Sequence, residues 1–159
     1  MKDTDISKFI FLSYSEKQTL KLGEKIANFL KAGDILCLFG PLGSGKTVFV
    51  KGIAKGLKIR PRIVNSPSFV LIREYEGKLP LYHIDLYRLK KVQDILKIGY
   101  QDYLYSEGIT AIEWAERLDW LLPNNYFRIE FEIVERNIRK LKFIPLDNHY
   151  NDILKKLKI

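Results

Sequence analysis

A glycine-rich segment at residues 40–47 constrains the fold of this chain more than any other feature of its sequence. It reads Gly-Pro-Leu-Gly-Ser-Gly-Lys-Thr and matches the phosphate-binding pattern G-x-x-x-x-G-K-[ST]. The apolar run 35–39 precedes it, as expected for a strand buried on both faces. Apolar residues at helical spacing follow over 46–57. This order predicts a phosphate-binding loop between a buried strand and a helix.

The residue types of the loop indicate which chemistry it supports. Glycines let successive backbone N–H groups turn inward around phosphate oxygens, and the helix N-terminus behind them adds positive potential. Lys46 is expected to place its charge on the β- and γ-phosphates, and the Thr47 hydroxyl to reach magnesium. We therefore expect a nucleoside triphosphate with Mg²⁺ to bind the loop residues, which are Gly40, Pro41, Leu42, Gly43, Ser44, Gly45, Lys46, Thr47 and Val48.

The remaining hydrophobic patterns predict an α/β fold of the P-loop NTPase type. Helices are expected near 15–31, 46–57, 91–97, 100–106 and 150–157, with a short one stopped before Pro123. Strands at 35–39 and 109–112 would form a parallel sheet near the glycine loop. Hairpins of 69–75 with 79–86 and of 127–133 with 138–144 would make that sheet mixed. With no linker or repeat, residues 1–159 are expected to form a single domain.

Acidic side chains at strand ends are the candidates for a metal and for catalysis. Glu113 follows the 109–112 strand, where α/β sheets gather ligands, so we expect it to supply the second metal contact. Asp85 also ends an apolar run and could orient water or magnesium. His83 precedes it by two residues and could face the same side, although a core histidine fits equally well. Ser68 lies in a Ser-Pro-Ser turn and could contact magnesium or the γ-phosphate, or simply form the turn.

Charge and cysteine content limit the setting of the protein. The chain has 27 Lys and Arg against 19 Asp and Glu, a net charge of +8. This excess favours a polyanionic partner or reflects only the base composition of a genome. The single cysteine, Cys37, has no partner for an intrachain disulfide, which favours a reducing compartment. Without a signal peptide or an apolar stretch of roughly 20 residues, the protein is expected to be cytoplasmic, with no membrane contact.

Four motifs in order along the chain resemble one family. Besides the glycine loop, they are Asn-Ser-Pro-Ser-Phe at 65–69, His-Ile-Asp-Leu-Tyr-Arg at 83–88 and Ala-Ile-Glu-Trp-Ala-Glu-Arg at 111–117. The glycine loop is shared by a vast superfamily, whereas His-x-Asp-Leu-Tyr-Arg followed by Ile-Glu-Trp is specific. Over about residues 15–122 the chain is therefore similar to the TsaE (YjeE) family of bacterial tRNA-modification ATPases.

The resemblance implies an ATPase that acts with TsaB and TsaD in making N6-threonylcarbamoyladenosine at position 37 of tRNA. TsaD performs the transfer in that family, and ATP hydrolysis by TsaE supports repeated turnover. Direct contact with tRNA is left open. The resemblance assigns roles to matching positions: Lys46 and Thr47 bind phosphate and magnesium, Glu113 binds magnesium, Asp85 is needed for hydrolysis, Trp114 lies near the nucleotide, and Thr19 lies near the adenine. The chain departs from the family at Ser68, where threonine is usual, and at Ala115, where proline often follows the tryptophan.

Two other functions share the loop and remain open. A small kinase would pass phosphate to an acceptor, whereas a nucleotide-dependent switch would bind partners without meaningful turnover. An ATPase would use Lys46 and magnesium to offset phosphate charge while Asp85 or Glu113 orients water. No Asn-Lys-x-Asp segment is present, which favours adenine over guanine. No residue is an obvious arginine finger, although Arg88, Arg117 or a partner could supply one, so slow hydrolysis by the isolated protein is expected.

Overall fold

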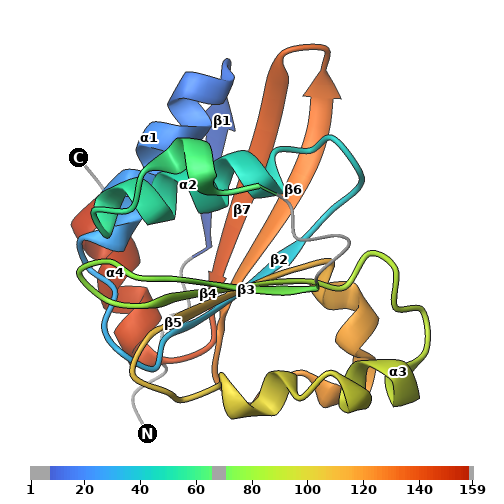
Figure 1. The fold of residues 1–159 in the computed structure, drawn as a ribbon. Helices are drawn as coiled ribbons and strands as arrows, with labels where there is room; N and C mark the ends of the chain where they lie inside the picture. The colour runs from blue at the N-terminus through green and yellow to red at the C-terminus, as the bar shows by residue number, and fades with distance from the viewer. Residues whose placement is uncertain (1–7, 66–70, 158–159) are drawn as a thin grey trace, which may run out of the picture.

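The strand that precedes the glycine loop is the central strand of a seven-stranded sheet (Figure 1). The computed structural model describes residues 8–65 and 71–157. Across the sheet the strand order is β1-β7-β6-β2-β5-β4-β3. The strands are β1 (Phe9–Ser13), β2 (Ile35–Phe39), β3 (Ile72–Tyr75), β4 (Leu81–Asp85), β5 (Ile109–Glu113), β6 (Phe127–Glu135) and β7 (Ile138–Pro145).

Helices cover both faces of the sheet because the central strand is apolar on both sides. Leu36 and Leu38 of β2 belong to the core under α1 (Glu16–Ala27), α2 (Lys46–Gly56) and α4 (Asn148–Leu157). Ile35 and Cys37 belong to the opposite core, under α3 (Val92–Lys97) and the 3-10 helices η2 (Tyr100–Asp102) and η3 (Ala115–Leu121). A further 3-10 turn, η1 (Pro61–Ile63), follows α2. Within the described ranges, no helix is long and apolar enough to cross a membrane.

Parallel pairing brings three strand ends to one edge of the sheet. β2 pairs in parallel with β5 and β6, and β4 pairs in parallel with β5. The carboxyl ends of β2, β4 and β5 therefore meet beside the glycine loop, as expected for ligand sites in α/β sheets. Asp85 and Glu113 end their strands directly opposite each other in register, so their side chains share a face.

The mixed α/β architecture predicted from the sequence is confirmed. β2 and β5 are parallel, and the β3–β4 and β6–β7 pairs are antiparallel hairpins. The turn near Asn137 also lies where the pattern placed it, between β6 and β7. Residues 66–70, and with them Ser68 and the first part of the expected strand 69–75, lie outside the described residues.

Several boundaries differ from the expected ones for local reasons. α1 ends at Ala27 and not near 31, because Asn28 caps it and a turn follows. The expected helix at 100–106 is a single 3-10 turn, since Gly99 and Tyr105 on either side have φ of 72° and 59°. The helix before Pro123 is likewise 3-10, with Asp119 at φ 49° interrupting it. Edge strand β1, which pairs antiparallel with β7, was not predicted from the sequence.

Candidate active site

The glycine loop leaves the first backbone N–H groups of α2 without a side-chain cap. Gly45 is the N-cap of α2 and, having no side chain, supplies no capping hydrogen bond. Gly43 and Gly45 have φ of 76° and 101°, a left-handed conformation that favours glycine. A Cβ at Gly43 would meet nothing within 4 Å, so backbone conformation and not space requires glycine there. The uncapped amides at a helix start form a suitable site for a phosphate.

Lys46 is buried with its ammonium group against the loop itself. Its side chain is 4% exposed, and Nζ donates to the carbonyl oxygens of Gly40 at 2.5 Å and Pro41 at 2.8 Å. The ring of Trp114 lies over the same ammonium, with its centroid 4.3 Å from Nζ. Burial lowers the pKa of Lys46, while nearby carboxylates, Glu113 foremost, act in the opposite direction.

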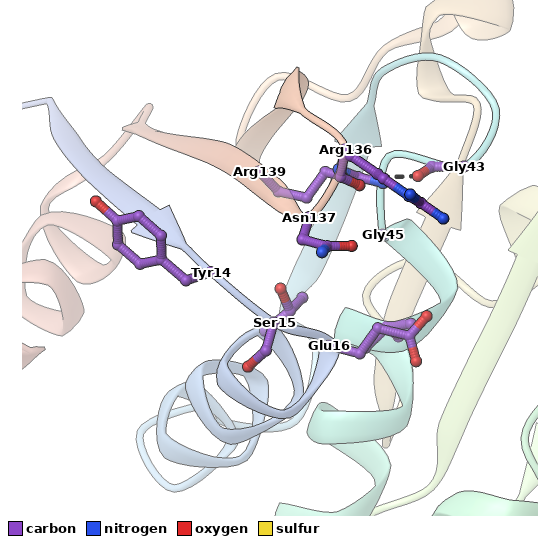
Figure 2. A pocket seen from close by; sticks show the side chains of 10 residues that line it. Tyr14, Ser15, Glu16, Gly43, Gly45, Arg136, Asn137 and Arg139 are labelled. Atoms are coloured by element: carbon purple, nitrogen blue, oxygen red, sulfur yellow. Dashed lines mark hydrogen bonds between the residues drawn. The ribbon is translucent and has the colours of Figure 1, made fainter.

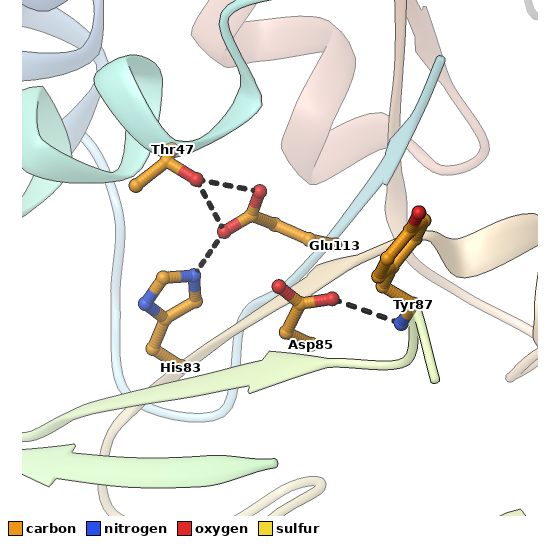
Figure 3. A network of polar contacts seen from close by, with 5 residues as sticks. All are labelled: Thr47, His83, Asp85, Tyr87 and Glu113. Carbon is orange, nitrogen blue, oxygen red and sulfur yellow. Dashed lines mark hydrogen bonds and ion pairs between the residues drawn. The ribbon is translucent and has the colours of Figure 1, made fainter. Parts of the chain in front are cut away.

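Thr47, Glu113 and His83 form a connected polar network at the end of β5 (Figure 3). The Thr47 hydroxyl lies 2.9 Å and 3.0 Å from the two carboxylate oxygens of Glu113 and donates to them. Nε2 of His83 lies 2.5 Å from Oε2 of the same carboxylate. Glu113 is 3% exposed and His83 is fully buried. These contacts link the start of α2 to β5 and β4.

Asp85 lies beside this network and points toward the same space (Figure 3). It is 2% exposed, and its Oδ1 accepts a hydrogen bond from the backbone N–H of Tyr87 at 2.9 Å. A pocket of about 350 Å³ brings these groups together. Its lining includes Lys46, Thr47, Asp85, Tyr87, Glu113 and Trp114.

The residues present fit a magnesium ion held together with phosphate. Mg²⁺ prefers oxygen ligands and in triphosphate sites takes only one or two from the protein, with the rest from phosphates and water. The Thr47 hydroxyl and the Glu113 carboxylate offer two such oxygens at the mouth of the glycine loop. Among the described residues, no group of three or more His, Cys, Asp or Glu could hold a metal alone. The donor set therefore suits a metal–phosphate complex better than a metal bound by protein alone.

A second pocket, of about 320 Å³ (Figure 2), adjoins the first along the glycine loop. Gly43, Gly45 and Val48 line both pockets. Thr19, from the first turns of α1, lines the second pocket and shares a 2.7 Å hydrogen bond with the Ser13 hydroxyl. The outer wall of this pocket is the β6–β7 turn, with Arg136 and Asn137, and the adjoining Arg139 at the start of β7.

Arg139 ties the β6–β7 turn to the glycine loop. Its Nε donates to the carbonyl oxygen of Gly43 at 3.3 Å. Its Nη1 donates to the carbonyl oxygens of Glu135 and Arg136, at 2.9 Å and 3.1 Å, which fixes the side chain within the turn. This wall was not predicted, because nothing in the pattern of residues 127–144 indicates a contact with a segment 96 positions earlier.

The structure brings most of the expected site residues together. Lys46, Thr47, Asp85 and Glu113 share one pocket. Trp114 lies over the Lys46 ammonium at the phosphate-loop end, whereas Thr19 lies in the neighbouring pocket. Ser68 lies outside the described residues.

Comparisons with known proteins agree on one family. Residues 13–141 match the family model described as "TsaE: Threonylcarbamoyl adenosine biosynthesis protein TsaE". The chain is 39% identical to the tRNA threonylcarbamoyladenosine biosynthesis protein TsaE of Bacillus subtilis, over 89% of this chain and 88% of that protein. It is 44% identical to the protein of the same name from Aquifex aeolicus, over 80% and 90%. The crystal structure of B. subtilis YdiB superposes with a TM-score of 0.82 at 33% identity, covering 96% of this chain and 95% of that one.

Proposed function

Because this chain belongs to the TsaE family of threonylcarbamoyladenosine biosynthesis proteins, we propose that it is an ATPase of that pathway. It would hydrolyse ATP to ADP and phosphate and so support repeated tRNA modification at position 37 by TsaB and TsaD. One observation carries the ATPase proposal. The glycine loop places Lys46 and Thr47 in one pocket with the buried carboxylates Asp85 and Glu113.

The phosphate end of the nucleotide would bind at the start of α2. Uncapped amides of the loop would donate to phosphate oxygens. The Lys46 ammonium, already directed at the loop carbonyls of Gly40 and Pro41, would turn toward the β- and γ-phosphates. Trp114 above it keeps that charge in a partly desolvated environment, where its attraction for phosphate is stronger.

The Thr47 hydroxyl and the Glu113 carboxylate would hold Mg²⁺. When bound, the ion neutralises charge that develops on the phosphate oxygens. Asp85 would orient the attacking water, because its carboxylate lines the pocket beside Lys46 and Thr47 while Glu113 is assigned to the metal. The Asp85 carboxylate would accept a hydrogen bond from that water.

The adenosine end of the nucleotide would occupy the second pocket. This pocket adjoins the first along Gly43, Gly45 and Val48, so one elongated ligand can extend through both. Thr19 and the Arg136–Asn137 turn line this pocket and would therefore lie next to the nucleoside. This arrangement supports the expectation that Thr19 lies near the adenine.

The decisive experiment measures phosphate release and tRNA modification in the same preparations. Purified protein with ATP and Mg²⁺ should release phosphate slowly without any acceptor, and faster with TsaB and TsaD. Lys46→Ala should bind ATP weakly and fail to support more than one round of modification. Phosphate transfer only in the presence of a small-molecule acceptor would favour a kinase, and binding without turnover would favour a switch. Unchanged multiple-round modification with Lys46→Ala would refute the proposal.

A further inference from the structure

The buried histidine of β4 has a structural relation to Glu113 that the proposed ATPase mechanism does not use. His83 lies two residues before Asp85 on the same face of β4. Its Nε2 lies 2.5 Å from Oε2 of Glu113, and the side chain is fully buried. Figure 3 shows the imidazole on one side of the carboxylate and the Thr47 hydroxyl on the other.

The hydrogen-bond pattern assigns the imidazole the role of donor. The Glu113 carboxylate accepts hydrogen bonds from Thr47, and each of its oxygens can accept a further one. An ionised carboxylate has no proton to donate to the imidazole. Nε2 must then carry the proton. Nδ1 of the same ring is buried and has no hydrogen-bond partner among the described residues. Among the described residues, the contact with Glu113 is therefore the hydrogen bond that this buried ring makes.

We propose that His83 is a positioning residue, which fixes the Glu113 carboxylate toward Thr47 and the magnesium ion. This inference rests on the proposed function, because it assigns a purpose to a contact within that site. If the Glu113 side chain could rotate freely, its carboxylate would not be held in the orientation that binds the metal. A histidine donor on Oε2 restricts that rotation and offsets the cost of burying the charge.

A solely structural role for His83 makes a different prediction. If the ring only filled space in the core, an apolar side chain of similar volume would replace it without affecting metal binding. The unpartnered Nδ1 argues against that reading, because a buried nitrogen without a partner costs free energy that an apolar residue would avoid. An imidazole is favourable at this position because its other nitrogen, Nε2, donates to Glu113.

The test compares the Mg²⁺ dependence of nucleotide binding in three variants. A fluorescent, slowly hydrolysed ATP analogue is titrated at increasing Mg²⁺ concentration. In His83→Leu, the Mg²⁺ concentration that gives half of the metal-dependent gain in affinity should rise about 10- to 100-fold. Metal-free affinity should stay within about threefold, because Lys46 and the loop amides are intact. His83→Gln, whose amide can still donate to Glu113, should recover most of the Mg²⁺ response.

The chain contains a matched control in its only other histidine. His149 also pairs with a buried carboxylate, its Nε2 lying 2.8 Å from Oδ2 of Asp34, but neither residue lines the two pockets of the candidate site. His149→Gln should leave the Mg²⁺ response unchanged. A folded His83→Leu variant with the wild-type Mg²⁺ response would overturn the inference. Absence of Mg²⁺-dependent binding in the wild-type protein would instead count against the proposed function.

A measurement on the unmodified protein covers the case in which His83→Leu does not fold. With only two histidines, the imidazole nitrogens can be assigned individually by ¹H–¹⁵N NMR. The proton of His83 should reside on Nε2 and exchange slowly with water. Its signal should shift when Mg²⁺ is added to the nucleotide-bound protein, while that of His149 should not. A proton on Nδ1, or no response to Mg²⁺, would overturn the inference.

Discussion

Lys46 illustrates how the loop residues gain their properties from distant parts of the chain. The motif itself explains why a lysine is present, but the ring above its ammonium belongs to Trp114, which follows β5. Burial lowers the pKa of Lys46 from its ordinary value of 10.5, and the carboxylates of Glu113, Glu116 and Asp85 counteract the decrease. The net direction is downward, so the free site loses its positive charge at a lower pH than an exposed lysine would.

The lowered pKa of Lys46 predicts that nucleotide affinity decreases at alkaline pH. Only the protonated amine attracts phosphate, and a bound phosphate stabilises that form, so affinity should fall as pH rises past the lowered pKa of the free site. The fall should reach up to about tenfold per pH unit and begin below pH 10.5. Calorimetric titration of an ATP analogue between pH 7 and 10.5 measures it. Lys46→Arg, which stays charged, should bind more weakly but without this decrease. If the affinity of Lys46→Arg decreased with pH as steeply as that of the wild-type protein, the prediction would be wrong.

A second prediction at this scale separates the role of Asp85 from nucleotide binding. Asp85→Asn keeps the shape of the side chain and its acceptor oxygen for the Tyr87 N–H, but removes the charge that would orient water. We expect the turnover of ATP to fall about 100-fold or more while nucleotide affinity changes by less than about threefold. Single-turnover hydrolysis and a binding titration on one preparation give both numbers. Equal losses in affinity and turnover would assign Asp85 a structural role instead.

At the element scale, glycines set how closely the two helices beside the loop approach. α1 and α2 pack against each other with almost no space between backbones. A Cβ on Gly52 of α2 would lie 2.1 Å from the carbonyl oxygen of Leu20, and one on Gly23 of α1 would lie 2.5 Å from that of Phe49. Both distances are shorter than real carbon contacts. The start of α2 therefore has a fixed position relative to α1, whose first turns line the second pocket.

Gly52→Ala is predicted to destabilise the fold. The added methyl group requires the helices to move apart, which typically costs about 1–3 kcal/mol, and the 2.1 Å contact with backbone favours the upper part of that range. Urea denaturation followed by circular dichroism measures the change. Lys55→Ala on the same helix loses only a surface ion pair with Glu24 and should change the free energy of unfolding by less than about 1 kcal/mol. An unchanged Gly52→Ala midpoint would show that the helices separate at no cost.

Some helices and strands could be predicted from the sequence and others could not. β2, α2 and β5 were predictable because buried strands and amphipathic helices leave continuous or periodic apolar patterns. β1 was not, because its short edge segment Phe-Ile-Phe-Leu-Ser reads as apolar without alternation, although Ile10 and Leu12 are exposed. Strand ends indicated Asp85 and Glu113 as site residues. Their direct opposition follows from the pairing register, which local sequence does not encode.

At the scale of the whole molecule, the candidate site joins segments from the full length of the chain. The two pockets are lined by the first turn of α1, the glycine loop, the ends of β4 and β5, and the β6–β7 turn. No single supersecondary unit contains the site. The sequence indicated the glycine loop and the carboxylates at the ends of β4 and β5. Tyr87 and the wall from the β6–β7 turn required the tertiary structure.

Because the site connects these segments, nucleotide binding should stabilise the fold as one unit. A ligand that binds only the folded state at 100 times its Kd adds about 2.7 kcal/mol to the free energy of unfolding. For a chain of 159 residues, each kcal/mol raises Tm by roughly 2–4 °C, so a shift of roughly 5–11 °C is expected. Differential scanning fluorimetry with ATP analogue and Mg²⁺ measures this shift, and GTP at equal concentration should give a smaller one.

Lys46→Ala should abolish most of the shift, since it removes the charge that attracts the phosphates from the site where the segments meet. A single transition that moves as a whole would show that the β6–β7 turn and α1 are coupled to the glycine loop, whereas two transitions, one of them unaffected by ligand, would show that they are not.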